Sequence, residues 1–596
     1  MNQVYEKRKE RFKTELDRAI RRSKAIENYR VITFLLGVTA FLGYTFYSQN
    51  YFFFFGTVAL LFVFLLLIAR YSKIKKIIGY LQNLIQINEM AILRLNGEWN
   101  TFNESGAEFI NFDHPYSFDL DIFGRGSLFQ YISAASTFMG KKSLADKLMG
   151  GSLFEEIIPR NESIKELAKA IEWRQSFQAR GMGADSKEES ITNLLKWAED
   201  KSSYNYKYLN YIFVLPAVTL LSLILYYFQL VYQNLPLLLI AVQALIASLS
   251  YKFVSRGFKD VDKSVRELSC YSYLLRLIET ENFNTPFLIS LQKKIMDDEE
   301  SAWEQIKELA KIADYINMRN AQPLIYFPLN ILTFWDIYTF KRLKEWKIKV
   351  GSSLEKWFKV IGEFEALSSF AGLAHDNPGW VFPEVNNGPP FLEAPSLGHP
   401  LINAEERVCN DASMPDPGSV MLITGSNMSG KSTFLRTIGV NLVLAYAGAP
   451  VCAEKMKCSF LKVYTKMQVH DDLEQKTSTF YAELKRIKMI IDATLDGKPV
   501  IFLLDEIFRG TNSEDRIYGT KAVIRNLSRS STIGLLTTHD LELASLEKEL
   551  PGLVKNFHFI DKIYNNKIHF DYRLRRGVSP STNAVALMKM IGIEME

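Results

Sequence analysis

Four long apolar runs constrain this chain more than any other feature of its sequence. They come in two pairs, Val31–Tyr47 with Tyr51–Ala69 and Tyr208–Phe228 with Leu235–Tyr251, and none contains a charged residue. Each has about the length, ~17–25 residues, that a helix needs to cross a bilayer core. Only the short links SQN and QLVYQN separate the members of a pair. The runs predict two transmembrane helical hairpins, 31–69 and 208–251, and thus four transmembrane helices. The alternative is an unusually apolar soluble core.

The distribution of lysine and arginine predicts how these hairpins are oriented. Basic residues flank both hairpins on their outer sides, whereas the two short links contain none. Because basic loops remain in the cytoplasm, we expect both termini and every soluble domain there. The chain is thus expected to be a multi-pass protein of the cytoplasmic (inner) membrane, in contact with the lipid bilayer. Residues 1–30 are expected to form a basic cytoplasmic helix, and the net charge of +5 is too small to indicate a nucleic-acid partner.

The rest of the chain divides into a helical middle and an α/β C-terminal part. Apolar residues recur at three- and four-residue spacing from Ser127 to Asp200 and from Gly257 to His375. This spacing predicts an all-α core or lever domain within the cytoplasmic segments 70–207 and 252–380. The passage DNPGWVFPEVNNGPP marks a boundary near residue 380. In 381–596 the runs SVMLIT and PVIFLLDE are apolar throughout, as strands buried on both faces of a sheet must be.

One short motif in this last part is typical of nucleotide binding. GSNMSGKS places Gly425, Gly430, Lys431 and Ser432 in the spacing G-x-x-x-x-G-K-[ST], between a predicted strand and a predicted helix. Glycines let the backbone N–H groups surround phosphate oxygens at a helix N-terminus. The lysine would reach the β- and γ-phosphates, and the serine hydroxyl would bind Mg²⁺. The motif predicts a P-loop that binds ATP and Mg²⁺.

Two further segments complete the predicted catalytic site. Asp505 and Glu506 end the buried strand in PVIFLLDE, where two carboxylates would be costly without a metal or a water network. Asp505 is predicted to hold Mg²⁺, and Glu506 to act as the general base toward the attacking water. His539 follows another apolar strand, in LLTTHDLE, and is predicted to sense the γ-phosphate.

These residues resemble the ATPase domain of the MutS mismatch-repair family. That family carries a P-loop of the form T-G-x-N-M-x-G-K-S-T, which matches Thr424–Thr433. Its further motifs resemble the segments DDL…STF…E, DEIFRGTN, TTHD and GHPLI of this chain. Upstream, GSLFQYISAASTFMGKKSLADKLM and FEALSSFAGLAH are similar to the start and the return of the family's helical core. The resemblance covers residues 120–200 and 360–596.

The resemblance implies an ATPase that works as a homodimer through its ATPase domains. In this family the S-T-F segment of one subunit approaches the γ-phosphate held by the other, and Ser478 is the residue that corresponds to this role. Arg509 would stabilise the composite interface. The residues implied to contact the nucleotide are Gly425, Asn427, Ser429, Gly430, Lys431, Ser432, Thr433, Ser478 and Arg509, and the catalytic ones are Glu506, Lys431 and His539. The family also implies DNA as a partner.

The chain departs from the family in its N-terminal half. Membrane helices stand where the family has its mismatch-reading domain, and the second hairpin interrupts the helical core where the family inserts its DNA clamp. We therefore expect a membrane-anchored MutS-like ATPase that binds DNA and lacks the mismatch-reading domain. Two alternatives remain open: an ABC-type transporter, against which the missing L-S-G-G-Q signature argues, and a membrane-tethered ATP-driven switch with a protein partner. The expected fold is a multidomain one: an α/β P-loop ATPase domain of ABC/MutS type, an all-α core and two transmembrane hairpins.

Overall fold

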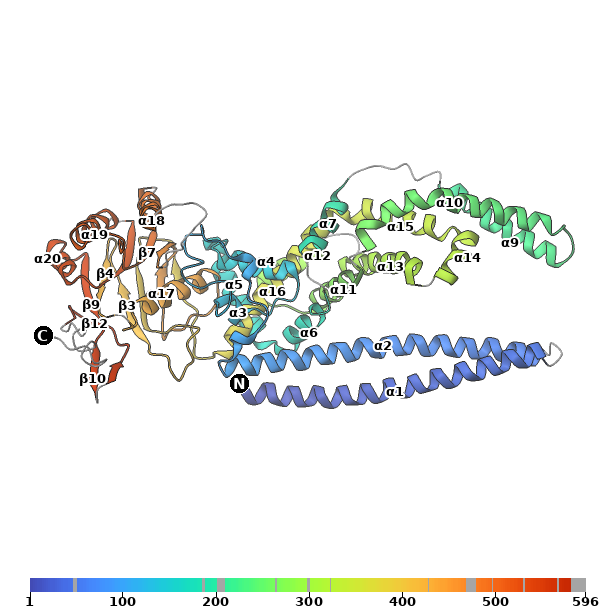
Figure 1. The fold of residues 1–596 in the computed structure, drawn as a ribbon, viewed down its shortest axis with the longest axis horizontal. Helices are drawn as coiled ribbons and strands as arrows, with labels where there is room; N and C mark the ends of the chain where they lie inside the picture. Colours follow the sequence, from blue (N-terminus) through green and yellow to red (C-terminus); the bar gives the residue numbers. More distant parts are fainter. Residues whose placement is uncertain are drawn as a thin grey trace.

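A computed structural model gives the fold of this protein, an elongated molecule with an α/β region at one end and two helical arms at the other (Figure 1). The residues that it describes are 1–46, 51–184, 188–200, 209–262, 265–296, 301–321, 323–426, 428–467, 479–495, 497–528, 531–564 and 567–579. They form a mostly helical molecule with an α/β C-terminal region, which confirms the fold class at this level.

The first arm is a hairpin of two very long helices, α1 (Asn2–Phe46) and α2 (Tyr51–Leu95), which pack against each other along their length. The basic segment 1–30 and the first apolar run therefore belong to one continuous helix. Near the base of the arm the hairpin buries apolar side chains, among them Phe12, Leu81 and Leu84. Farther along, most side chains of the apolar runs are exposed or partly exposed.

The second arm contains the other pair of apolar runs and the helices that pack against it. Its elements are α7 (Glu188–Glu199), α8 (Leu209–Ile212), α9 (Val214–Tyr227), α10 (Asn234–Asp262), α13 (Ala302–Ala321), α14 (Pro323–Thr333) and α15 (Trp335–Val350). The run Tyr208–Phe228, expected as one helix, is divided at Phe213 into α8 and α9. Pro216 explains the break, because a proline removes a helical N–H and clashes with the carbonyl of the residue four positions earlier.

By length and composition, three of the described helices can cross a membrane: α1, α2 and α10. The fourth predicted helix is represented by α9, which is apolar but has only 14 residues. At 1.5 Å per residue it is ~21 Å long, shorter than the ~30 Å of a bilayer core.

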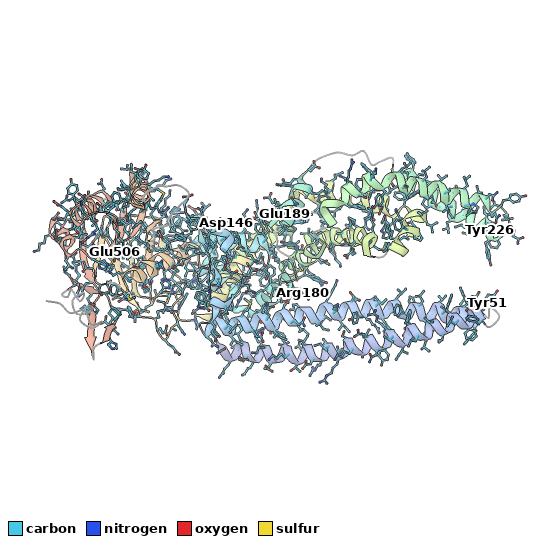
Figure 2. All side chains as sticks on the ribbon, viewed as in Figure 1. Tyr51, Asp146, Arg180, Glu189, Tyr226 and Glu506 are labelled. Atoms are coloured by element: carbon cyan, nitrogen blue, oxygen red, sulfur yellow. The ribbon has the colours of Figure 1, made fainter. Side chains whose placement is uncertain are left out.

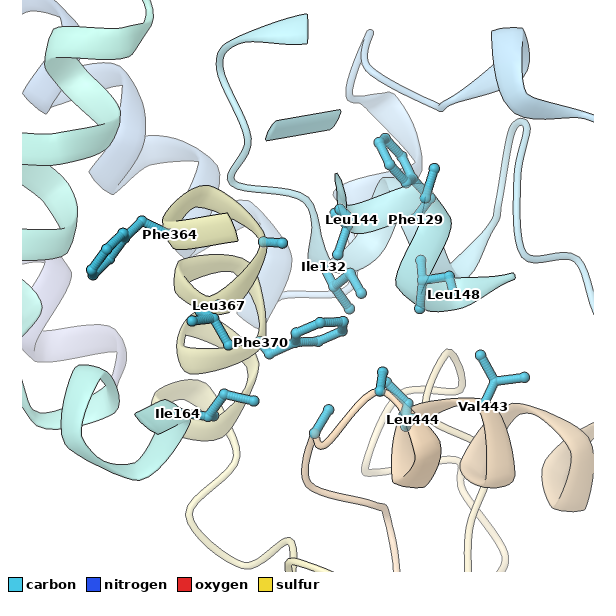
Figure 3. Close-up of a cluster of buried hydrophobic side chains, with 14 of the residues drawn as sticks. Phe129, Ile132, Leu144, Leu148, Ile164, Phe364, Leu367, Phe370, Val443 and Leu444 are labelled. Atoms are coloured by element: carbon cyan, nitrogen blue, oxygen red, sulfur yellow. The ribbon is translucent and has the colours of Figure 1, made fainter. Parts of the chain in front are cut away.

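The helical middle connects both arms to the α/β region. It consists of α3 (Leu128–Ile132), α4 (Phe138–Leu148), α5 (Phe154–Lys169), α6 (Ile171–Gly181), α11 (Val265–Thr280), α12 (Pro286–Met296) and α16 (Leu354–Asp376), with short 3₁₀ turns at Trp99–Thr101, Ala107–Phe109 and Gly351–Ser353. The central helix, α16, packs on α4 and α5. Figure 3 shows Phe364, Leu367 and Phe370 of α16 beside side chains of α3, α4, α5 and α17. The helical middle and the α/β region thus share one hydrophobic core.

The α/β region begins just after the boundary that was expected near residue 380. Its strands are β1 (Glu384–Asn386), β2 (Leu392–Leu397), β3 (Asn410–Met414), β4 (Val420–Thr424), β5 (Lys457–Ser459), β6 (Lys462–Lys466), β7 (Val500–Asp505), β8 (Thr532–Thr538), β9 (Val554–His558), β10 (Asp561–Tyr564), β11 (Lys567–Phe570) and β12 (Arg575–Arg576). Its helices are α17 (Lys431–Tyr446), α18 (Thr479–Leu495), α19 (Ser513–Leu527) and α20 (Leu546–Glu549), with a 3₁₀ turn at Leu541–Ser545.

A six-stranded sheet with the order β12-β9-β4-β8-β7-β6 organises this region. Its strands are parallel except for β12 at the edge. Every residue of β4, β7 and β8 is buried, as the continuous apolar runs predicted. Because β8 lies between β4 and β7, the carboxyl ends of these three strands meet at one edge of the sheet.

Candidate nucleotide-binding site

The site is built at the carboxyl ends of three adjacent parallel strands. In the register of the sheet Thr424 of β4 pairs with Thr538 of β8, and Asp505 of β7 pairs with Thr537 of β8. The segments that follow these strands, far apart in the sequence, are thereby brought to the same edge. Ligands bind at this edge in open parallel sheets.

Two glycines of the loop after β4 adopt backbone conformations that suit a phosphate-binding loop. Gly425 has φ 151° and Gly430 has φ 105°, a region that favours glycine. Gly430 is the N-cap of α17, so the N-terminus of this helix points at the loop. A Cβ atom at Gly425 would lie 3.0 Å from the Ser429 hydroxyl oxygen and 3.2 Å from the Phe559 carbonyl oxygen. The loop is therefore closely packed at Gly425, where a larger residue would not fit without a shift of its neighbours.

Three polar side chains of this loop fit a phosphate group. The Lys431 ammonium group donates hydrogen bonds of 2.8 Å to the carbonyl oxygens of Gly425 and Ser426, which hold it inside the loop. Burial lowers the pKa of Lys431, and the Glu506 carboxylate opposes this effect. The buried hydroxyls of Ser426 and Ser429 have no hydrogen-bond partner among the described residues. These donors match the oxygen atoms of a polyphosphate.

The start of α17 and the end of β7 together provide oxygen ligands that Mg²⁺ prefers. The Ser432 hydroxyl donates to Oδ2 of Asp505 at 2.7 Å, and the Thr537 hydroxyl donates to its Oδ1. Mg²⁺ is usually held by one or two protein oxygens together with water and substrate phosphates. Accordingly, the described residues contain no group of three or more His, Cys, Asp or Glu side chains that would form a metal site alone. Ser432 and Asp505 therefore fit Mg²⁺ that is bound together with a nucleotide.

Glu506, labelled in the α/β region in Figure 2, contacts three cationic or titratable side chains. Its carboxylate contacts the Nε2 atom of His539, the Arg509 guanidinium at 2.6 Å and the Lys431 ammonium at 3.4 Å. Burial alone would raise the pKa of Glu506, but His539, Lys431 and Arg509 together lower it to about 2. The carboxylate is therefore ionised at neutral pH, as a general base must be. Its φ of 46° is unusual for a residue other than glycine, and such backbone conformations cluster at functional sites.

A cavity of about 650 Å³ opens between the P-loop and the first segments of the α/β region. Gly430, Lys431, Ser432, Thr433, Glu506 and Arg509 line one part of it. The remaining wall is made of residues that the sequence did not indicate as site residues, including His399, Glu406, Asn410, Phe559 and Tyr572. The volume and the mixed apolar and polar wall are typical of a small-molecule site.

Two of the missed residues had a signal in the sequence. Thr537 is the first residue of the TTHD segment, and its hydroxyl donates a hydrogen bond to the Asp505 carboxylate. His399 belongs to GHPLI and lies against the cavity, with a pKa that burial and the nearby Arg436 and Arg407 lower to about 4. Phe559 and Tyr572 had no such signal, because they reach the cavity only through the pairing of β9 with β4 and the loop beyond β11.

Comparison with known proteins agrees with this geometry. Residues 421–596 match the family model described as MutS domain V. The DNA mismatch repair protein MutS of Aquifex pyrophilus is 31% identical over 263 residues, which are 43% of this chain and 30% of that protein. The MutS protein of Bacillus subtilis (strain 168) is 30% identical over 301 residues, 49% of this chain and 34% of that protein. These matches support membership of the MutS family.

The match to MutS is a partial one. The chain spans about a third of the length of the curated MutS relatives that it matches. The matched part includes the segment Gly425–Ser432, the Asp505–Glu506 pair and His539. The structure brings these residues into contact, since Asp505 contacts Ser432 and Glu506 contacts both Lys431 and His539. Asn427 and Ser478 lie outside the described residues, so their predicted roles remain predictions.

Proposed function

We propose that this protein is a membrane-anchored MutS-like ATPase, which hydrolyses ATP at a composite site between two copies of the chain and acts on DNA. The observation that carries the proposal is the cavity lined by Lys431, Ser432 and Glu506, in the part of the chain that matches MutS domain V. Asp505 contacts Ser432 and His539 contacts Glu506, so both adjoin this wall.

Each of these side chains has a role that follows from its position. Bound Mg²⁺ would neutralise phosphate charge, and Ser432 and Asp505 would hold it. Lys431 would bind terminal phosphate oxygens in place of the loop carbonyls that it now contacts. Glu506 would take a proton from the attacking water, and His539 and Arg509 would hold the Glu506 carboxylate in position.

Two substitutions separate nucleotide binding from hydrolysis. Glu506→Gln should retain ATP but lower steady-state hydrolysis by ~10²–10⁴-fold, because the general base is lost. Lys431→Ala should weaken ATP binding by ~10–100-fold, because a charged hydrogen-bond donor is lost. Glu514→Gln, at an exposed carboxylate in the first turn of α19, is the matched control and should leave both values unchanged. Normal turnover in Glu506→Gln would remove this residue from the mechanism.

Mixed dimers test the composite site. Lys431→Ala subunits cannot hold ATP well, and Ser478→Ala subunits would fail to complete the site of their neighbour. In a mixed dimer both defects fall on one site, and the other site is intact. About half the wild-type activity per heterodimer should therefore return. If heterodimers form and activity does not return, Ser478 has no role in the neighbouring site.

The burial pattern of the second arm supports the proposed membrane anchoring. In α9 the buried residues are Thr219 and Ser222, and in α10 Gln243 is 0% exposed, with no partner for its amide among the described residues. The leucines beside them, such as Leu221 and Leu245, are more than half exposed. Water would favour the reverse arrangement. Lipid favours this one, because in hydrocarbon polar side chains turn toward the interior.

DNA binding, like the composite site, rests on the family resemblance alone. A salt series with the detergent-solubilised protein and duplex DNA tests it, since phosphate contacts give a steep negative slope of log K against log salt. A protein partner would remain the alternative if no salt-dependent binding is found.

A further inference from the structure

The helix α14 is an apolar element that neither the expected transmembrane runs nor the ATP site explains. We propose that α14 is an additional membrane-embedded element of the second arm, which lies in the interfacial layer of the bilayer with Phe327 and Leu332 in contact with lipid. This inference rests on the proposed membrane anchoring and extends it to a segment that was expected to be cytoplasmic.

The sequence of α14 fits a helix that enters a bilayer without crossing it. No charged residue lies between Arg319 and Asp336, and the helix itself reads PLIYFPLNILT. With 11 residues it is ~16 Å long, about half the thickness of a bilayer core. Apolar helices of this length are typically buried, re-entrant or interfacial.

In α14, polar side chains face the interior of the second arm, and apolar side chains face its surface. Tyr326 is 1% exposed and its hydroxyl donates to Oδ2 of Asp336 at 2.5 Å. The buried Asn330 accepts a hydrogen bond from the backbone N–H of Asp336. By contrast, Phe327 is 58% exposed and Leu332 is 42% exposed. A helix in a soluble core would bury its apolar side chains and expose its polar ones. The arrangement in α14, with polar residues buried and apolar residues exposed, is the same as in α9 and α10.

The turn after α14 attaches it to the base of the second hairpin. Phe334 has φ 53° and is fully buried, and it forms a small cluster with Ile337 and with Ala247 of α10. Side chains on both sides of the break between α8 and α9 pack against this cluster. The helix itself contacts both α9 and α10 (Figure 1). If lipid surrounds the hairpin, lipid therefore also contacts α14.

Aromatic and basic side chains mark the level at which the arm would leave the membrane. The Arg319 guanidinium lies 3.8 Å from the centre of the Tyr251 ring and donates to the Ser255 hydroxyl at 2.9 Å. Trp335 packs edge-on against Tyr315, and the partly exposed Tyr338 packs edge-on against Phe213. Tyrosine, tryptophan and arginine are enriched at the headgroup level of membrane proteins. These residues flank α14 and Phe334, which places the helix just inside that level.

A fluorophore at Phe327 tests this placement directly. The full-length protein carries Phe327→Cys, labelled with an environment-sensitive dye, and Cys270 and Cys409 are replaced by alanine. It is reconstituted into phosphatidylethanolamine–phosphatidylglycerol vesicles that contain nitroxide-labelled lipid. The nitroxide near the top of the acyl chain should quench the dye more than one at its end. Leu332→Cys is the second reporter, should Phe327→Cys fold poorly.

Two reference positions make the outcomes distinct. Leu221→Cys on α9 reports the transmembrane hairpin, and Ile348→Cys reports an exposed apolar residue near the other end of α15. We expect strong quenching at Leu221, Phe327 and Leu332 and none at Ile348. Quenching at Leu221 without quenching at the two α14 positions would overturn the placement of α14 alone. Loss of quenching at Leu221 as well would overturn the membrane anchoring. Disulfide formation between copies through Phe327→Cys, without lipid quenching, would assign this face to a second copy and also overturn the proposal.

Discussion

Glu365 of α16 is a carboxylate that the helical core encloses completely. It accepts hydrogen bonds from the backbone N–H groups of Ser136 and Thr137 and from the Thr137 hydroxyl. Burial nevertheless dominates and raises the pKa of Glu365 from 4.5 to about 7. Between pH 4.5 and about 7, the Glu365 carboxyl group is therefore protonated in the folded state and ionised in the unfolded chain.

This shift predicts that stability declines with rising pH. The contribution of Glu365 is fully present below pH 4.5 and is lost as the pH rises through about 7. Its size is on the order of 3 kcal/mol. Glu365→Gln imitates the protonated side chain and removes this dependence. The melting temperature of the wild type minus that of Glu365→Gln should thus fall between pH 5 and pH 8. A difference that is constant over this range would contradict the prediction.

Local motifs made some residues of the site predictable and others not. Lys431, Ser432, Asp505 and Glu506 belong to short segments whose spacing alone indicates phosphate and metal chemistry. The structure places Lys431, Ser432 and Glu506 around one cavity, with Asp505 hydrogen-bonded to Ser432. Phe559 and Tyr572 lie more than a hundred residues from the P-loop in sequence and reach it through sheet pairing. Neither periodicity nor spacing carries that information, because it depends on the order of the strands.

At the scale of helices, α4 and α16 cross so closely that each has a glycine at the contact. A Cβ atom at Gly362 of α16 would lie 2.5 Å from the carbonyl oxygen of Met139, and Gly140 of α4 faces the Glu365 side chain. The neighbour of Gly362 is backbone, which cannot rotate away. This crossing fixes the helix that connects the arms to the α/β region.

Gly362→Ala should therefore destabilise the protein by ~1–3 kcal/mol, the usual cost of overpacking. Gly372→Ala, on the same helix, is the matched control. Its Cβ atom would meet only the Arg174 side chain at 3.5 Å, an ordinary contact, and alanine is the better helix former by ~1 kcal/mol. Thermal unfolding of the two variants in detergent should separate them clearly. Equal melting temperatures would show that the crossing is less rigid than its geometry indicates.

The elements were predictable where one physical preference dominates. Charge-free apolar runs predicted the apolar parts of α1, α2 and α10, but not the charged continuations of these helices, and continuous apolar runs predicted β4 and β7. The break at Phe213 follows from Pro216, whose effect the overall hydropathy of the run concealed. The continuity of α1 through residue 30 was not predictable from composition, since the segment changes from charged to apolar while its backbone remains helical.

At the scale of the whole molecule, the two arms end on the same side, far from the α/β region. Figure 2 shows Tyr51 and Tyr226 at the ends of the arms and Glu506 at the other end of the molecule. A single bilayer can therefore receive both arms, with the nucleotide site held away from it. This arrangement agrees with the orientation that the basic residues predict.

Cysteine labelling tests this orientation in intact cells. Tyr232→Cys lies in the exposed link between α9 and α10 and should react with a membrane-impermeant maleimide from outside. Glu189→Cys, exposed near the start of α7, should react only after permeabilisation. Labelling of Glu189→Cys from outside would overturn the topology.

The base of the first arm is connected directly to the end of α16, the helix that leads into the α/β region. The Tyr5 hydroxyl donates to Oδ1 of Asp376 at 2.5 Å in a buried position, and the Arg94 guanidinium lies 3.8 Å from Oδ2 of Asp376. Burial and this carboxylate raise the pKa of Tyr5, so the tyrosine remains a donor. Two residues that are 371 positions apart thus join the N-terminus to the last residue of α16.

Tyr5→Phe keeps the packing of the ring and removes only this hydrogen bond. A bond to a charged acceptor contributes ~1.5–3 kcal/mol, which corresponds to a ~10–100-fold change in the equilibrium for local opening. Amide hydrogen exchange in the first turns of α1 should accelerate by this factor, because these turns exchange through local opening rather than global unfolding. Tyr29→Phe, at an exposed position of the same helix, is the control and should leave exchange unchanged. If ATP binding to the α/β region moves α16, addition of ATP to the wild type should alter protection in the same turns, and Tyr5→Phe should abolish that response. Unchanged exchange in Tyr5→Phe would show that the arm is held to the core by its apolar contacts alone.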